Sequence, residues 1–172
     1  MLNRISIVEG DITEQTVDAI VNAANKELRG GGGVDGAIHQ AAGPGLLEAC
    51  KKIGGCPTGE AVVTDGFDLP ARWIIHTAGP VWRGGSDDED FLLASCYHHS
   101  LQRAEENAAR TIAIPAISTG IYGFPAARAA RIAVTETVSF LHGHDLPESV
   151  VFVCFDRDSV DCHQAAVADV IA

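Results

Sequence analysis

Apolar residues follow two alternating spacings along the chain. Short β-branched runs bounded by Gly, Pro, Asp or Asn are typical of strands. Between them lie longer segments in which apolar residues recur every three or four positions, as Leu93, Cys96, Tyr97 and Leu101 do, and this spacing is typical of helices. The pattern predicts strands at residues 4–8, 18–22, 61–64, 73–77, 111–117 and 150–155, and helices at residues 34–42, 45–51, 88–109, 126–142 and 159–171.

Two of the predicted strands, residues 112–114 and 150–155, are apolar on both faces. Such strands lie in the middle of a sheet that helices cover on both sides. The alternation of strands and helices therefore predicts an α/β fold with three layers, helices on either side of a central sheet. A length of 172 residues fits one domain, residues 1–172, which can bury a core without disulfide or metal cross-links.

The excess of acidic residues limits which kinds of molecule the protein is expected to bind. Twelve Lys and Arg residues stand against 23 Asp and Glu, so the formal net charge is −11. We therefore expect no nucleic acid partner, because phosphate backbones require clustered cations. A bound phosphate would have to be held locally, by backbone N–H groups and helix ends.

The chain shows no sign of a membrane or secretory location. No apolar run approaches the roughly 18 residues of a membrane helix, and the first residues reach Glu9 and Asp11 without a signal peptide pattern. The five cysteines are scattered, which argues against a disulfide framework and a four-cysteine zinc site. We expect a cytoplasmic protein.

The first concentration of chemistry follows the strand that ends near Asn22. After Asn25 come four consecutive glycines, Gly30 to Gly33, then Val34, Asp35 and a predicted helix. Consecutive glycines carry a large entropy cost, which is tolerated where backbone must approach a ligand closely or adopt positive φ. At a helix N-terminus such a loop offers N–H groups and partial positive charge to an anion. A flexible surface loop is the weaker alternative.

The second concentration follows the apolar strand at 111–117. A turn leads from this strand into another helix and consists of Ser118, Thr119, Gly120, Ile121 and Tyr122. Its hydroxyl and N–H groups again suit phosphate oxygens. Two such junctions at the carboxyl ends of strands predict two adjacent phosphates, that is, a diphosphate.

Two familiar nucleotide motifs do not fit. Gly31, Gly33 and Gly36 formally match the dinucleotide fingerprint, but residues 51–57 lack the carboxylate expected about 20 residues later. No P-loop sequence occurs. By contrast, Asp11 could accept a hydrogen bond from an adenine amino group, or could simply cap a turn. Phe155 could offer a flat face to a base, or could pack in the core.

Taken together, these segments resemble the macrodomain family, in particular its MacroD-type branch and the bacterial O-acetyl-ADP-ribose deacetylases within it. The likeness spans almost the whole chain and is carried by residues 10–13, 17–25, 30–39, 56–60, 76–82 and 115–123. It implies a mixed, central six-stranded sheet between helices, and a small-molecule ligand, ADP-ribose or a derivative.

The resemblance also implies roles for individual residues. Asp11, Ile12 and Phe155 would contact the adenine. Asn25 would hold the distal ribose and Asp35 would be the catalytic carboxylate. The residues that would surround the diphosphate and distal ribose are Gly33, Val34, Ser118, Thr119, Gly120, Ile121 and Tyr122.

The implied reaction is ester hydrolysis, in which water attacks an acyl carbon carried on a ribose hydroxyl. O-acetyl-ADP-ribose would give acetate and ADP-ribose, and a protein carrying mono-ADP-ribose on Asp or Glu would give the free side chain. Asp35 would orient the water and accept its proton, the ligand's own phosphate could share this role, and neither a cofactor nor a metal is required.

A reader module that binds ADP-ribose without turnover is the alternative function, and a regulatory protein is a weaker alternative. ADP-ribosylated proteins are further expected partners, whereas the oligomeric state, monomer or homodimer, stays open.

The histidines receive plainer interpretations. His98 and His99 are adjacent on a predicted helix and face apart, so we expect no shared metal site. His39 follows the glycine loop and His76 lies in an apolar strand. His39 could reach the pocket, but we expect it to be a packed histidine, and we expect His76 to be satisfied in the core. No cysteine and histidine are singled out as a nucleophilic pair.

Overall fold

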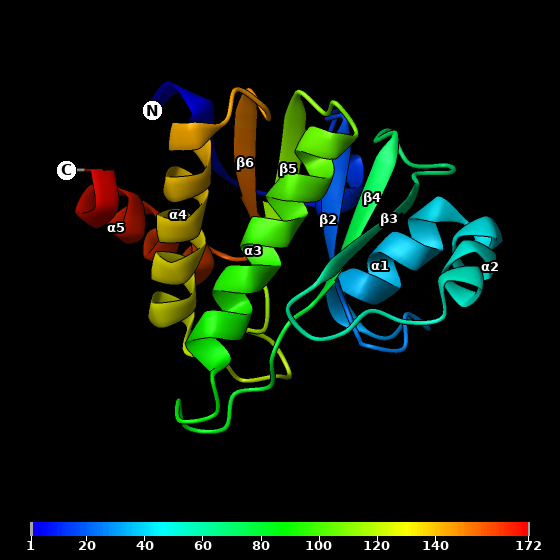
Figure 1. The fold of residues 1–172 in the computed structure, drawn as a ribbon, viewed down its shortest axis with the longest axis horizontal. Helices are drawn as coiled ribbons and strands as arrows, with labels where there is room; N and C mark the ends of the chain where they lie inside the picture. Colours follow the sequence, from blue (N-terminus) through cyan, green and yellow to red (C-terminus); the bar gives the residue numbers. More distant parts are fainter. Residues whose placement is uncertain (1, 172) are drawn as a thin grey trace.

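The computed structural model describes residues 2–171 and contains a six-stranded sheet in the order β1-β6-β5-β2-β4-β3 (Figure 1). All neighbouring strands are parallel except β3 and β4, which are antiparallel. The predicted mixed six-stranded sheet is therefore confirmed. The strands are β1 (Ile5–Glu9), β2 (Ala19–Ala24), β3 (Ala61–Asp65), β4 (Trp73–Ala78), β5 (Thr111–Pro115) and β6 (Ser149–Cys154).

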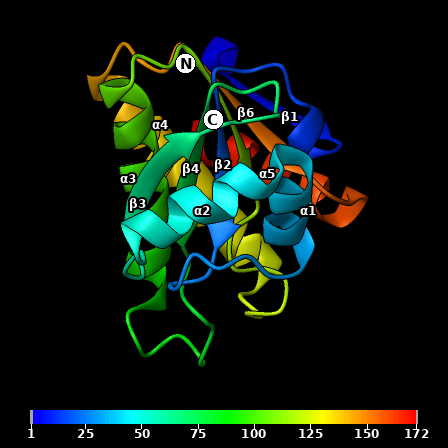
Figure 2. The same ribbon diagram turned by 90° about the vertical axis from the view of Figure 1, so that its right-hand side faces the viewer.

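Helices cover both faces of the sheet, so the three-layer prediction is confirmed as well. Figure 2 turns α1 and α2 toward the viewer, and their buried side chains form one apolar cluster with β2 and β4. The side chains of α3, α4 and α5 form a second cluster with β5 and β6. The helices are α1 (Gly33–Ala42), α2 (Pro44–Ile53), α3 (Glu89–Glu106), α4 (Ala126–Gly143) and α5 (Arg157–Ile171), with short 3₁₀ turns η1 (Leu2–Arg4) and η2 (Ile12–Glu14).

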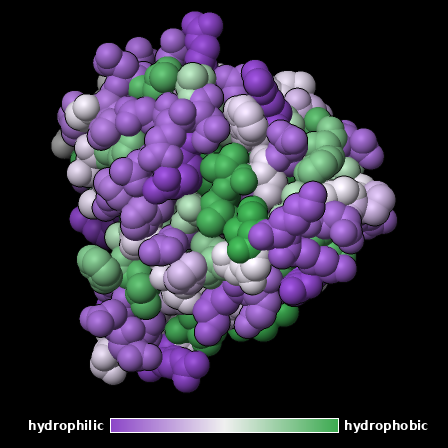
Figure 3. Space-filling model, turned by 45° about the vertical axis from the view of Figure 1, so that its right-hand side comes forward, coloured by the Kyte–Doolittle hydropathy of each residue, from purple (hydrophilic) through white to green (hydrophobic). Residues whose placement is uncertain are grey.

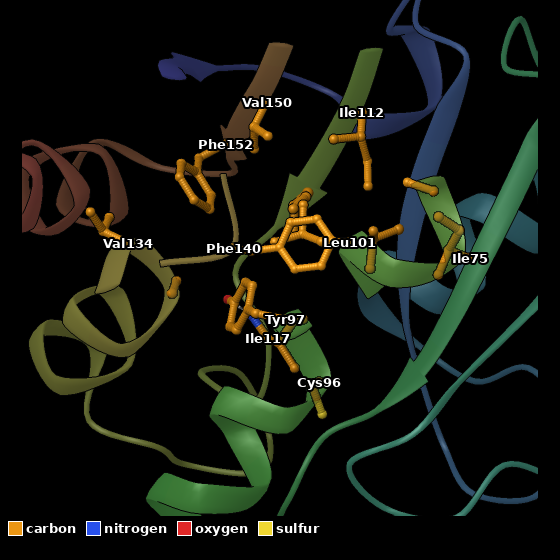
Figure 4. Packing of buried hydrophobic residues seen from close by; sticks show 14 of the residues in the cluster. Ile75, Cys96, Tyr97, Leu101, Ile112, Ile117, Val134, Phe140, Val150 and Phe152 are labelled. Atoms are coloured by element: carbon orange, nitrogen blue, oxygen red, sulfur yellow. Dashed lines mark hydrogen bonds between the residues drawn. The ribbon is translucent and has the colours of Figure 1, made fainter. Parts of the chain in front are cut away.

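The larger cluster is built from long apolar side chains of distant segments. Figure 4 shows Tyr97 and Leu101 from α3 close to Phe140 from α4 and Phe152 from β6. Tyr97, Leu101 and Phe152 are at most 1 % exposed, as expected for a close-packed protein interior. Figure 3 shows a face that is mostly polar, with one apolar patch near its centre and smaller apolar spots around it.

The predicted boundaries hold to within a few residues. Strand β5 ends at Pro115 rather than 117, and α3 ends at Glu106 rather than 109. The residue after this helix, Asn107, caps it by donating its backbone N–H to Arg103 O. No helix within residues 2–171 is long and apolar enough to cross a membrane.

Candidate functional site

The site lies where the parallel strands end. Strands β1, β6, β5, β2 and β4 run in the same direction, so their carboxyl ends meet at one edge of the sheet. The segments that follow β2 and β5 are the two loops singled out in the sequence. Ligands of open α/β sheets bind at this edge.

The two loops line one cavity of about 300 Å³. One wall consists of residues 31–35 and the other of residues 116–118 and 120–122, and Gly79, which follows β4, also lines the cavity. The loops are therefore brought together as the sequence predicts. The predicted site residues that line the cavity are Asn25, Gly33, Val34, Asp35, Ser118, Gly120, Ile121 and Tyr122.

The first wall is the N-terminus of α1. Gly33 has φ 58°, in the left-handed region that favours glycine. The N–H groups of Gly33 and Val34 belong to the first helical turn and have no partner four residues earlier in the helix. Asn25 fixes the loop before them, because its Nδ2 donates to Gly30 O (2.8 Å) and its Oδ1 accepts from Arg29 N (3.2 Å).

The second wall is the turn after β5. Ser118 has φ 66° and is buried, and its Oγ has no hydrogen-bond partner within residues 2–171. The turn is held by Phe124 N donating to Ser118 O (2.9 Å) and by Trp82 N donating to Tyr122 O (2.9 Å). A Cβ on Gly79 would collide with Ser118 Oγ, so this position requires glycine.

Asp35 carries the only charged side chain that lines the cavity among the described residues. It is 6 % exposed, and its Oδ1 accepts a hydrogen bond from Asn22 Nδ2 at 2.8 Å. The Nε2 atom of His39, one turn later on α1, lies 3.5 Å from the same oxygen. His39 is thus packed, as predicted, but it also faces the carboxylate.

Without any Lys or Arg in its lining, the cavity must bind an anion through main-chain N–H groups and the α1 dipole. Such a site can hold a diphosphate, with the Asp35 carboxylate beside the neighbouring part of the ligand. This is the arrangement that the net charge of −11 led us to expect.

Sequence reasoning missed a polar chain behind Asp35. Asn22 also contacts His76 Nδ1 (3.1 Å), and His76 Nε2 contacts Thr64 Oγ1 (2.9 Å). Burial, together with the nearby His39, lowers the pKa of His76 to about 3, so its imidazole is neutral at physiological pH. Polar residues inside otherwise apolar strands were the available signal, but their contacts depend on strand order.

Four of the predicted site residues lie outside the cavity lining. Asp11 caps η2, since its Oδ1 accepts from Thr13 N (2.9 Å) and Thr13 Oγ1 (2.7 Å). Ile12 is buried, at 5 % exposure. Phe155 is 88 % exposed, so the core-packing alternative for this residue is wrong. Thr119 lines a second, smaller cavity of about 130 Å³ between α4 and α5.

A buried cysteine and histidine do meet, away from the main cavity. Cys154 Sγ lies 3.6 Å from His163 Nδ1, which donates to Ser159 O at 2.8 Å. Burial raises the pKa of Cys154 and lowers that of His163, so both stay neutral and no thiolate forms. Within residues 2–171 no three His, Cys, Asp or Glu side chains are grouped to hold a metal ion.

Comparison with known proteins places this site in a family. The Macro domain family model matches residues 21–133. A Macro domain-containing protein of Methanosarcina mazei is 58% identical over 170 residues, which are 99% of this chain and 91% of that protein. An O-acetyl-ADP-ribose deacetylase of Escherichia coli K12 is 54% identical over 168 residues, 95% of either chain.

Solved structures agree. The Oceanobacillus iheyensis macrodomain with ADP superimposes with a TM-score of 0.92 at 45% identity, covering 96% of this chain and 90% of that one. The Trypanosoma brucei macrodomain in complex with ADP-ribose gives a TM-score of 0.90 at 43% identity, covering 96% and 70%. The resemblance read from the motifs is confirmed: the chain belongs to the macrodomain family.

Proposed function

We propose that this macrodomain is an O-acetyl-ADP-ribose deacetylase, a hydrolase that releases acetate and ADP-ribose. The observation that carries the proposal is a buried carboxylate, Asp35, inside a cavity whose other walls offer main-chain donors, hydroxyls, the Asn25 amide and apolar groups, but no second charge among the described residues. Relatives that carry this name are 54% to 57% identical over nearly the whole chain. The ligands in the structures of the neighbours, ADP and ADP-ribose, each contain a diphosphate that fits this proposal.

In the proposed complex the ligand extends across the strand ends. The diphosphate accepts hydrogen bonds from the N–H groups of Gly33, Val34 and the turn at 118–122, and Ser118 Oγ is available as a further donor. The adenine lies outside the cavity. There the exposed ring of Phe155 stacks on it, Ile12 contacts it and Asp11 accepts from its amino group through Oδ2, which the turn cap does not use.

The distal ribose, in turn, lies at the inner end, beside Asn25 and Asp35. The second N–H of Asn25 Nδ2 is free of the loop contact to Gly30 and donates to a ribose hydroxyl. Ile121, which is 98 % exposed in the second wall, covers the bound sugar from the solvent side, and Gly120, Tyr122 and Thr119 complete the turn.

The chemistry then follows from Asp35. Its carboxylate takes a proton from a water molecule as the water oxygen forms a bond to the acyl carbon. The bond from that carbon to the ribose oxygen breaks, and this oxygen leaves as a hydroxyl by accepting the proton that Asp35 took from the water. General base assistance of this kind contributes about 10²–10⁴-fold.

A test separates the enzyme from a reader module. Acetate release from O-acetyl-ADP-ribose is measured for the wild type and Asp35→Asn, and ADP-ribose binding is measured by calorimetry for both. We expect a fall in kcat of about 10²–10⁴-fold with little change in affinity. Tight binding without release by the wild type would leave the reader function, and equal rates would remove Asp35 from the mechanism.

The same bond occurs in proteins that carry mono-ADP-ribose on Asp or Glu, and we propose these as a second substrate class. Ile121 lines the cavity and is 98 % exposed, so this wall reaches the protein surface. An acyl group bound beside it can therefore be part of a Glu or Asp side chain whose protein lies outside the cavity. A peptide modified on Glu tests this: release of ADP-ribose supports the proposal, and no release, with O-acetyl-ADP-ribose still hydrolysed, refutes it.

We propose the cytoplasm as the location, in keeping with the five free cysteines.

A further inference from the structure

Three polar side chains are buried on the sheet face beneath α1 and α2. Asn22 and His76 are 0 % exposed and Thr64 is 7 % exposed. Asn22 on β2 and His76 on β4 are directly paired in the sheet, and Thr64 lies on the edge strand β3. The surrounding side chains are apolar, among them Ile20 and Ile74. A buried polar group is costly unless it is hydrogen-bonded. The contacts among these three side chains therefore determine which atoms donate, which accept, and which tautomer His76 adopts.

The contacts form one chain that ends at Asp35. Thr64 Oγ1 lies 3.1 Å from Asp65 O and 2.9 Å from His76 Nε2. His76 Nδ1 lies 3.1 Å from Asn22 Nδ2, and the same Nδ2 lies 2.8 Å from Asp35 Oδ1. Because a carbonyl only accepts, the Thr64 hydroxyl donates to Asp65 O, which leaves its lone pairs for His76.

The direction of each remaining bond follows. His76 Nε2–H donates to Thr64, so the neutral ring has an unprotonated Nδ1 that accepts from Asn22. Asn22 then uses its two N–H groups for His76 and for Asp35. If the ring had the other tautomer, Nδ1–H would require the amide to turn its oxygen toward His76. That oxygen would then face Asp35 Oδ1, and two acceptors would repel each other.

We infer that Thr64 and His76 are positioning residues for Asp35: the Thr64 hydroxyl fixes the tautomer of His76, which fixes the amide of Asn22, which orients the carboxylate. This rests on the proposed role of Asp35 as the base. The amide keeps its orientation although Asn22 Oδ1 has no hydrogen-bond partner within residues 2–171. A merely satisfied core histidine would contribute stability but would not change the rate at which bound substrate reacts.

The tautomer can be observed directly. In ¹⁵N spectra of the unliganded, histidine-labelled protein, His76 should show a protonated Nε2 and an unprotonated Nδ1 near neutral pH. In Thr64→Val, which keeps the shape and removes the hydroxyl, we expect a mixture of tautomers. A protonated Nδ1 in the wild type, or an unchanged spectrum in Thr64→Val, would overturn the inference.

Two substitutions of His76 divide its functions. His76→Asn keeps an acceptor near the Nδ1 position and loses the contact to Thr64, whereas His76→Gln keeps a donor near Nε2 and loses the acceptor that faces Asn22. We expect His76→Gln and Thr64→Val to lower kcat about 10-fold to 10²-fold at unchanged KM, as small misplacements of reacting groups do. His76→Asn should retain more activity than His76→Gln.

Thr77→Val is the matched control, because Thr77 is also buried on β4 and its hydroxyl donates to Glu60 O (2.8 Å), away from Asp35. It should lose stability but not kcat per folded molecule. Equal kcat losses in Thr77→Val and Thr64→Val would overturn the positioning role. If Asp35→Asn were fully active, the base role would fail and this inference with it. If Asp35→Asn were inactive and Thr64→Val were normal, only the positioning role would fail.

Discussion

The carbonyl oxygen of Gly31 fills the space in which a side chain on Gly36 would begin. The glycine loop therefore folds back onto the first turn of α1, and Gly36 N donates to Gly32 O (3.2 Å). This close contact between loop and helix holds Gly33 and Val34, which line the cavity, in place.

Replacing Gly36 should consequently reverse the usual effect of adding a methyl group to a helix. Gly→Ala within a helix commonly stabilises a protein by about 0.4–1 kcal/mol. Gly36→Ala should instead lower the free energy of unfolding by about 1–3 kcal/mol, because the backbone must move to relieve the overlap. It should also weaken ADP-ribose binding. Gly143→Ala in α4, where a Cβ meets nothing within 4 Å, is the control for denaturation and calorimetry. Equal stability of the two variants would contradict the prediction.

The exposed ring of Phe155 should matter for binding but not for stability. Phe155→Ala removes a side chain that is 88 % exposed, so the melting temperature should hardly change. Stacking of an aromatic ring on a base contributes about 1–3 kcal/mol, so the affinity for ADP-ribose should fall about 5-fold to 150-fold. Phe91→Ala, which removes another exposed ring (71 %), is the control and should bind normally. A normal affinity in Phe155→Ala would remove this residue from the adenine site.

Much of this site was predictable because its signals are local. A glycine run before a helix and a Ser-Thr-Gly turn after an apolar strand each have a direct conformational cause. Asn22, Thr64 and His76 were not found in this way, because hydrophobic periodicity does not give the order β2-β4-β3 that brings them together. Phe155 was ambiguous for a related reason: β6 ends one residue earlier, which turns the ring outward.

The buried imidazole of His76 should make the protein sensitive to acid. In the folded chain burial and His39 hold the pKa of His76 near 3, against its ordinary value of 6.5. Between these values the unfolded chain binds the extra proton, so stability falls as the pH drops through the window, by up to about 1.4 kcal/mol per pH unit. Urea denaturation at several pH values should show a steeper loss for the wild type than for His76→Asn. Identical slopes would contradict the assignment.

Glu89 anchors the loop that precedes α3. Burial opposes ionisation of its carboxyl, but hydrogen bonds from the N–H groups of Arg83, Gly85 and Asp87 outweigh this and lower the pKa of Glu89 to about 2. The folded pKa is depressed from 4.5, so this stabilisation is present above pH 4.5 and is lost as the pH falls toward 2. Glu89→Gln should therefore lower the melting temperature near neutral pH, and hydrogen exchange in residues 83–87 should become faster. The difference from wild type should shrink in acid.

The proposed binding of the diphosphate through peptide N–H groups has a consequence for mutational scanning. Replacing Val34 or Tyr122 by alanine removes a side chain but leaves the N–H in place, so an alanine scan should show nearly unchanged phosphate affinity at these positions. Proline or D-residue substitutions, and amide-to-ester exchange, would expose the donors that such a scan overlooks. Raising the ionic strength should likewise weaken the complex only slightly, since no lysine or arginine among the lining residues is there to be screened.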